Sequence, residues 1–134
     1  MSNPLITNVD IYGVTLSDYK TKTVTVELGQ NIVAGEVLGI NTSTGEYKTC
    51  DSTAVDGSQY ARAVAFYDVD ATLSALNTTV LLASDLDSSK LIFSNIADTL
   101  DTVPAGSTDS YYTQLRDFNL YAENTNNLYN EDNQ

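Results

Sequence analysis

Residues 23–50 decide the fold, and they read TVTVELGQNIVAGEVLGINTSTGEYKTC. The stretch opens with strict alternation, because Val24, Val26 and Leu28 fall on one face of an extended chain. The residues between them are threonines and a glutamate, which suit the opposite, solvent-facing side. This pattern predicts a half-buried β-strand over residues 23–28, with the two valines and Leu28 facing the core.

The apolar run that follows, residues 32–40, is interrupted by Gly35 and Gly39. Glycines inside a β-rich stretch are typical of bulges or of places where another backbone approaches closely. Residues 42–45 read as a turn, and residues 46–50 have the length of a short returning strand. The sequence therefore predicts a β-hairpin directly after the first strand.

Further short apolar segments continue the strand pattern after the loop 51–58. Residues 61–67 are mostly apolar and of strand length, and residues 79–83 predict another strand that closes at the acidic turn 84–87. The segment 91–93 fits either a short strand or the start of a helical turn, because periodicity does not separate the two over three residues.

One helix is expected near the C-terminal end, after the breaker residues 104–106. Ser107 or Thr108 can cap it, and Asp109 in the first turn suits the positive end of the helix dipole. Asn119 is a suitable left-handed C-terminal cap, because Asn tolerates that backbone conformation. The expected helix carries its apolar side chains on one face: Tyr111, Leu115 and Phe118.

The composition favours β-structure with many loops. Thr, Ser and Asn make up nearly a third of the 134 residues, whereas charged residues reach only 18 %. Side chains of this kind prefer turns, caps and strand surfaces to helix interiors. A chain of this length suits one domain with its own core. We therefore expect a mainly β (α+β) fold: a small β-rich domain with one short C-terminal helix.

The charge and the missing residue types exclude several functions. The chain has no His, which removes the common general base and the commonest metal ligand, and one Cys, Cys50, cannot form an intrachain disulfide. A net charge of −12 repels phosphate, so we expect no nucleic-acid partner. No apolar run reaches membrane-spanning length and no signal-peptide pattern is present, so we expect no membrane partner and synthesis in a cytoplasm.

Two acidic segments and the aromatic residues leave alternatives open. Asp68-x-Asp70 and Asp85-x-Asp87-x-Ser89 resemble the start of a calcium loop, but they lack its sixth-position Gly and its terminal Glu, so structural turns are favoured. The nine Tyr and three Phe suit either a sugar-binding surface or a core and subunit interface, and we favour the latter. Cys50 fits a small buried hydrophobe better than a reactive thiol. We therefore predict no catalytic set, no metal and no cofactor.

Several different short motifs follow one another in a defined order in the middle of the chain. They are Ala34-Gly35-Glu36-Val37-Leu38-Gly39, Thr44-Gly45-Glu46-Tyr47, Asp56-Gly57-Ser58-Gln59, and Ala63-Val64-Ala65 leading into Asp68-Val69-Asp70-Ala71. A later motif is Leu115-Arg116-Asp117-Phe118-Asn119-Leu120. In this order and spacing, residues 20–121 resemble the head decoration (capsid cement) proteins of tailed bacteriophages, the lambda gpD-like family. That family tends to have Gly where this chain has Asn119.

The resemblance implies a structural virion protein and not an enzyme. It implies trimers on the outer surface of the capsid, at local threefold positions, with the major capsid protein as partner and the shell stabilised against internal DNA pressure. It also implies an N-terminal arm that orders on the shell. We accordingly divide the chain into an arm (1–20), a decoration domain (21–121) and an acidic, Asn-rich tail (122–134).

The arm and the interfaces have candidate residues. The first twenty residues supply apolar anchors for an extended docking arm: Ile6, Val9, Ile11 and Val14. The alternative for this segment is a frayed terminus. Candidate trimer or capsid contacts are Ile32, Val33, Tyr47, Tyr60 and Tyr67. The alternative function is a carbohydrate- or host-surface-binding module displayed on a virion or cell, because Thr, Ser, Asn and Tyr also suit sugar contacts.

Overall fold

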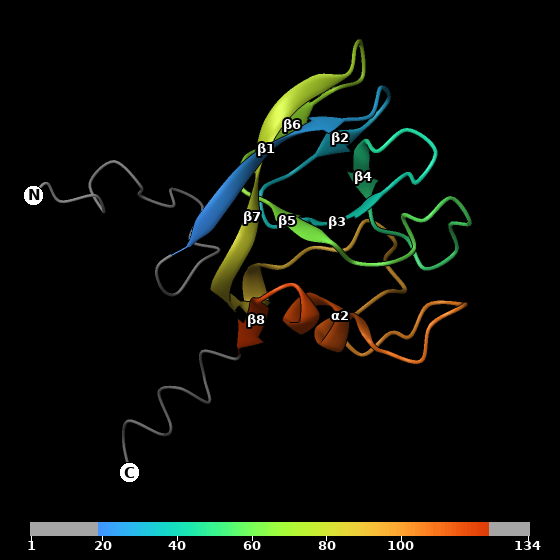
Figure 1. Ribbon diagram of the computed structural model, residues 1–134, viewed down its shortest axis with the longest axis vertical. Helices are drawn as coiled ribbons and strands as arrows, with labels where there is room; N and C mark the ends of the chain where they lie inside the picture. The colour runs from blue at the N-terminus through green and yellow to red at the C-terminus, as the bar shows by residue number, and fades with distance from the viewer. Residues whose placement is uncertain (1–18, 124–134) are drawn as a thin grey trace, which may run out of the picture.

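The structure, a computed structural model, describes residues 19–123 (Figure 1). The described residues form a strand-rich domain, which confirms the mainly β class. Its elements are β1 (Lys20–Val26), β2 (Asn31–Ile32), β3 (Val37–Ile40), β4 (Tyr47–Thr49), β5 (Ala63–Ala65), β6 (Val69–Asp70), β7 (Leu76–Asp87), the 3₁₀ helix η1 (Ser88–Lys90), the α-helix α2 (Tyr111–Asp117) and β8 (Leu120–Glu123).

The main sheet closes into a small barrel. Its strand order is β1-β4-β3-β5-β7-β8, and β1 also pairs with β7, so that five strands form a ring to which β8 is added. The β1–β4 closure is one parallel bridge, Val26 to Tyr47, whereas β1 and β7 pair antiparallel from Lys20 to Val26. The 12-residue strand β7 therefore pairs with β1 and β5 through its first part and with β8 through Ser84–Asp87.

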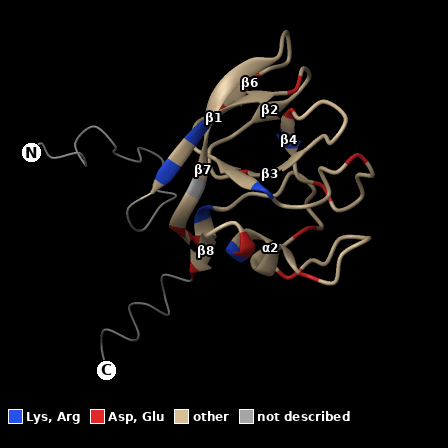
Figure 2. Ribbon diagram, in the orientation of Figure 1, with Lys and Arg blue, Asp and Glu red and all other residues tan. Residues whose placement is uncertain are grey.

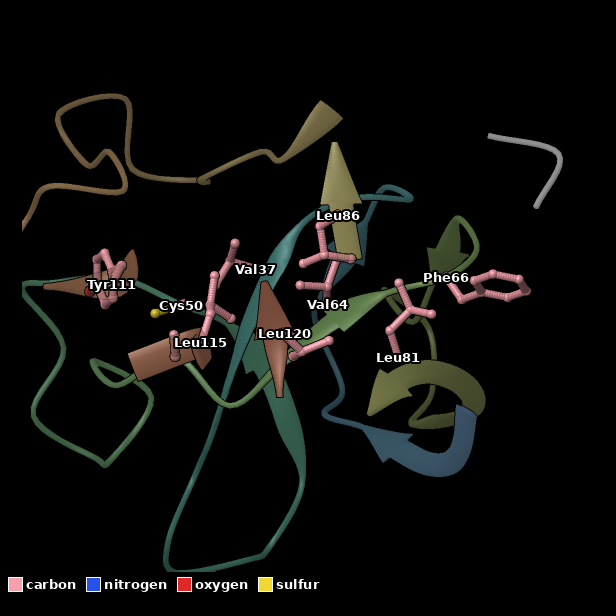
Figure 3. Close-up of a cluster of buried hydrophobic side chains, with 10 residues drawn as sticks. Val37, Cys50, Val64, Phe66, Leu81, Leu86, Tyr111, Leu115 and Leu120 are labelled. Carbon is pink, nitrogen blue, oxygen red and sulfur yellow. The ribbon is translucent and has the colours of Figure 1, made fainter. Parts of the chain in front are cut away.

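Two clusters of buried side chains lie on opposite faces of the ring strands. The inner cluster consists of Val24, Val26, Ile32, Leu38, Ala63, Ala65, Val69, Ala71 and Val80. The outer cluster, drawn in Figure 3, consists of Val37, Cys50, Ala61, Val64, Phe66, Leu81, Leu86, Tyr111, Leu115 and Leu120. Successive residues of a strand alternate between the two clusters, as the two-residue period of a strand requires.

The central strands are buried on both faces because α2 and β8 cover the outside of the barrel. In β3, Val37 belongs to the outer cluster and Leu38 to the inner one, and Val64 in β5 lies between two inner-cluster alanines. This is why 37–40 and 63–65 read as continuous apolar runs, whereas the half-covered β1 shows alternation.

The glycine-spaced motif before and within β3 has two structural causes. Gly35 has a φ of 90° in a tight turn that the Glu36 N–H closes by donating to the Val33 carbonyl at 3.1 Å. A Cβ at Gly39 would lie 2.4 Å from the carbonyl oxygen of Ser58, whose backbone crosses β3 at this point. The predicted close backbone approach is confirmed at Gly39, and the predicted hairpin is confirmed by the antiparallel β3–β4 pairing.

Two strand predictions are corrected. The strand expected over 79–83 extends from Leu76 to Asp87, so residues 84–87 are not a turn. They remain extended because β8 lies parallel to them and supplies backbone partners. Leu28 does not face the core: β1 ends at Val26, and Leu28 is 57 % exposed.

The helix is shorter than expected. Its cap is Ser110, whose side chain accepts a hydrogen bond from the Thr113 N–H, so neither Ser107 nor Thr108 caps it and no acidic residue lies in its first turn. Tyr111 and Leu115 are buried as predicted, but Phe118 is the C-cap and is exposed. Asn119 has a φ of 65°, which confirms the left-handed conformation expected there.

Candidate interaction surfaces

Ile32 is a core residue and not a surface contact. It is 1 % exposed and pairs with Val69 where β2 and β6 run antiparallel. Val33, which follows the last residue of β2, is exposed, while Ile32 packs in the inner cluster. The prediction that Ile32 contacts a partner is therefore corrected, because its side chain is buried in the inner cluster.

Val33 and Tyr67 lie on adjoining segments. The Ala34 N–H donates to the Asp68 carboxylate at 2.8 Å and the Gly35 N–H donates to the Ala65 carbonyl, which holds the two segments together. Both side chains are about two-fifths exposed, and the Tyr67 ring packs edge-on against Phe66 at 4.8 Å between centroids. These two residues form one exposed apolar patch beside the β2–β6 pair.

Tyr47 and Tyr60 lie apart from that patch. Tyr47, in β4, is half-buried against the inner cluster, and this burial raises the pKa of its phenol while the charge of Arg62 lowers it. The Tyr60 hydroxyl donates to the Ala105 carbonyl at 3.4 Å, near α2. The candidate contacts are thus distributed over separate parts of the molecule.

Sequence patterning missed an apolar group at one end of the barrel. Leu28, Leu73 and Leu76 are all exposed, Leu73 by 94 %. The Gly29 N–H donates to the Ala71 carbonyl at 2.8 Å, so the loop after β1 and the loop before β7 lie side by side at the upper end in Figure 1. Leu73 follows a turn in which the Asp70 carboxylate accepts hydrogen bonds from the N–H and the hydroxyl of Thr72. The position of Leu73 next to polar residues of a turn was the sequence signal for its exposure.

Aromatic residues and both arginines of the chain lie around α2. The Arg62 guanidinium carbon is 5.5 Å from the centre of the Tyr60 ring and 5.0 Å from that of Phe118. Arg116 lies 5.8 Å from the ring centre of Tyr112. Arginine and aromatic side chains are enriched in protein–protein interfaces. Of this group only Tyr60 is among the predicted contacts, and the Arg62–Phe118 pair joins residues too far apart in the chain for a local pattern to indicate it.

Charge is unevenly arranged over the surface (Figure 2). Lys20 and Lys22 lie in the exposed beginning of β1, and acidic residues lie in several of the loops. The ion pairs within residues 19–123 are those of Lys48, with Glu27 at 3.2 Å and with Asp56 at 3.1 Å. Hydrogen bonds from the Ser58 hydroxyl and N–H, together with Lys48, lower the pKa of Asp56 to about 2.

The reactive groups of the described chain serve structural roles. Cys50 is buried, and this burial raises the pKa of its thiol to about 12, which keeps it neutral. Burial also raises the pKa of Glu36, whose carboxylate accepts hydrogen bonds from the Thr49 hydroxyl and the Val33 N–H. Asp70 and Asp87 accept from the residues two positions on and so fix turns.

Residues 19–123 contain neither a cluster of side chains arranged for a metal ion nor a helix suited to a membrane. No group of three or more Cys, Asp or Glu side chains in this part of the chain is arranged to hold a metal ion. None of its helices has both the length and the apolar character that crossing a bilayer requires.

The comparison with protein families identifies the family. The model of bacteriophage lambda head decoration protein D matches residues 11–108. The chain belongs to the phage lambda head decoration protein D family. The match spans β1 to η1, and it also covers the Ile11 and Val14 positions of the predicted arm. No curated protein sequence matches the chain.

Membership in the decoration family establishes the general role. Proteins of this family are structural components of the phage head, so this chain has a capsid-decorating and non-enzymatic function on the virion. The arm anchors Ile6, Val9, Ile11 and Val14 lie outside the described residues. The motif 115–120 lies beyond the family match, although Asn119 in it has the left-handed backbone that a Gly would adopt.

Proposed function

We propose that this protein binds the outer surface of the phage head as trimers, at local threefold positions, and stabilises the shell against the pressure of packaged DNA. The observation that carries the proposal is the family match over residues 11–108, which includes every strand of the barrel. The fold supports it, because a closed barrel with two packed clusters gives a rigid body that can bridge capsomers.

A threefold ring uses a heterologous contact, in which two different patches of each subunit meet. The chain offers patches of this kind in different places. Val33 and Tyr67 are exposed beside the β2–β6 pair, and Tyr60 lies beside α2 with its neighbouring rings. We assign these residues, together with the half-buried Tyr47 of β4, to the trimer or capsid contacts.

Residues 1–20 would act as the capsid-docking arm, through Ile6, Val9, Ile11 and Val14. An extended segment can add a strand to an exposed sheet edge of the major capsid protein, where backbone hydrogen bonds give affinity and side-chain pockets give register. Ordering the arm costs about 1–2 kcal/mol per residue in backbone entropy. Three arms on one trimer offset the weakness of each, because the first docking raises the effective concentration of the others.

We assign separate roles to the arm and the decoration domain of the chain. Residues 21–121 form most of the body that stands on the shell, and the arm of residues 1–20, whose last residue already lies in β1, attaches it. The acidic tail, residues 122–134, begins within β8 and has no assigned part in the attachment.

Reconstitution on phage heads that lack their decoration protein tests the proposal. Heads are incubated with the full chain, examined by electron cryomicroscopy, and heated with and without the protein. We expect trimeric protrusions on the outer surface at local threefold positions and a higher temperature of head disruption. Binding at other positions, or saturated binding without any gain in head stability, would overturn the corresponding part of the proposal.

A further inference from the structure

Arg62 lies at the wall of a cavity beside α2. The cavity has a volume of about 370 Å³, and its lining includes Tyr60, Arg62 and Phe118 together with Gln114, Asp109 and Asp117. The guanidinium lies within cation–π distance of both rings, as given above, and one of its N–H groups donates to the Ala61 carbonyl at 2.9 Å. The two rings and this bond hold the guanidinium in place.

The wall around Arg62 is built from buried polar contacts. Gln114 is 6 % exposed; its Oε1 accepts from the Ala61 N–H at 2.7 Å, and its Nε2 donates to the Ser107 hydroxyl and the Asp109 carbonyl. Gly106 has a φ of 84°, and a Cβ there would lie 2.6 Å from the Tyr60 hydroxyl oxygen. The loop before α2 is therefore shaped to admit the Tyr60 side chain beside the cavity.

The guanidinium has donors to spare. Arginine carries five N–H donors in a planar fork that matches a carboxylate with two parallel hydrogen bonds. Within residues 19–123, no carboxylate lies within 4.0 Å of Arg62, since the ion pairs of this part are those of Lys48. An arginine held by rings, bonded once and next to a cavity is pre-organised for a carboxylate from outside.

We propose that the Arg62 cavity binds the carboxylate of an Asp or Glu side chain from a second copy of this chain, an inference that rests on the trimer of the proposed function. Charge complementarity favours a second copy as the source. The chain has 18 acidic residues and 6 basic ones. Acidic residues outnumber basic ones threefold, so each copy presents many carboxylates to its neighbour.

Asp109 and Asp117 make the cavity selective. Their charges repel a free anion that reaches the cavity from solution, so that small carboxylates gain little there. A carboxylate fixed on a neighbouring subunit arrives with the rest of the interface, whose aromatic contacts offset that repulsion. The pair then sets the register of the contact, which is the usual contribution of a charged pair within an interface.

Two matched variants, Arg62→Lys and Arg116→Lys, test the role of the guanidinium. Both keep the charge and both remove an arginine stacked on a ring, but only the first removes the planar donor fork from this cavity. With full-length protein on undecorated heads, we expect the Arg62→Lys variant to require about a tenfold higher concentration for half-occupancy, and the Arg116→Lys variant to stay within about twofold of wild type. Equal behaviour of the two variants would overturn the proposal.

Crosslinking identifies the occupant even if Arg62→Lys fails to fold. A photoreactive phenylalanine analogue replaces Phe118, which is exposed next to Arg62, and labelled and unlabelled copies are mixed on the heads. We expect crosslinks between copies, to a peptide that contains Asp or Glu. Crosslinks to the major capsid protein, or none on fully decorated heads, would overturn the inference but not the decoration itself. Failure of wild-type protein to bind heads would instead overturn the proposed function.

Discussion

Ile32, the last residue of β2, and Val33, which follows it, have opposite roles although they are neighbours in the chain. Ile32 packs in the inner cluster, whereas Val33 is exposed one position later. Both are β-branched aliphatic residues of similar hydrophobicity, so their types do not distinguish them. Their roles are set by the register of β2 against β6, which places Ile32 opposite the buried Val69.

Replacing the exposed Tyr67 by Asp should weaken occupancy on phage heads. The change removes an exposed aromatic ring from the Val33–Tyr67 patch and adds a charge to a chain that is already strongly acidic. Binding to undecorated heads gives the measurement, with thermal unfolding as the check on the fold. Tyr67→Phe, which keeps the ring on Phe66, should bind nearly as wild type. Full occupancy by Tyr67→Asp would remove this patch from the interface.

The stability of the barrel should fall in acid partly through Asp56. Its pKa is lowered to about 2 in the folded protein, mainly by the bonds from Ser58, below the ordinary value of 3.8. Its contribution is therefore present above about pH 4 and is lost as the pH falls towards 2. Urea unfolding at pH 5 and pH 2.5 should show a larger loss for wild type than for Asp56→Asn. The same loss in both proteins would mean that other carboxyl groups account for it.

At the scale of elements, α2 begins where its surroundings satisfy the backbone. The Tyr111 N–H donates to the Thr102 carbonyl and the Tyr112 N–H to the Leu100 carbonyl, so the preceding loop supplies partners for two free helix donors. The Ser107 hydroxyl, an expected cap, instead accepts from the Asp109 N–H. Ser110 is left as the residue whose side chain caps the helix.

The cap can be tested by two alanine substitutions. Ser110→Ala should lower the free energy of unfolding by about 1 kcal/mol, because the bond from the Thr113 N–H is lost. Thr108→Ala should change it by less than about 0.5 kcal/mol, the usual range for a surface substitution. Urea unfolding of both variants measures the difference. A larger effect at Thr108 would show that the helix is capped there in solution.

Deletion of residues 2–18 separates attachment from folding. The two clusters and the ring closure are formed by residues that the deletion retains, so the truncated protein should stay folded. We expect it to lose most binding to heads and to leave them more fragile to heat or chelators. Circular dichroism and head-binding assays measure the two effects, with Ile6, Val9, Ile11 and Val14 replaced by Ser in the full chain as the control. If the truncated protein decorates and stabilises heads as well as the full chain does, the arm is not needed for attachment.

At the scale of the whole molecule, the protein combines a rigid barrel with a large negative charge. Each chain carries a net charge of −12, so three chains in a ring repel one another. In the proposed trimer, short-range packing would therefore have to hold the subunits together, and the exposed aromatic side chains around α2 and beside β6 are suited to this. The pair proposed at Arg62 would lie within such a contact, where salt screens it less than it screens charges in solution.

Occupancy on heads should consequently be unchanged or higher in moderate salt. At physiological ionic strength charges are screened over about 8 Å, which weakens the repulsion between subunits more than their contacts. Binding isotherms at low and physiological salt measure this, with the Lys22→Gln variant as a probe of the exposed β1 lysines. A collapse of binding between the two salt concentrations would show that attraction between opposite charges dominates.

The sequence by itself determined the local structure. The alternation around Val24 and Val26, the glycine spacing of residues 35–39 and the left-handed Asn119 each follow from backbone geometry over a few residues, and each is confirmed. The ordered motifs of residues 34–70 also predicted the family, because they mark turns and close contacts that this fold requires.

Only the tertiary structure decided which surfaces are exposed and how far elements extend. β7 continues through Asp87 because β8 lies beside it, and Arg62 meets Phe118 because the barrel brings distant segments together. Leu28 is exposed although it continues the apolar alternation, because β1 ends two residues earlier. Such outcomes depend on contacts between residues far apart in sequence, whereas a local pattern records only the preferences of neighbours.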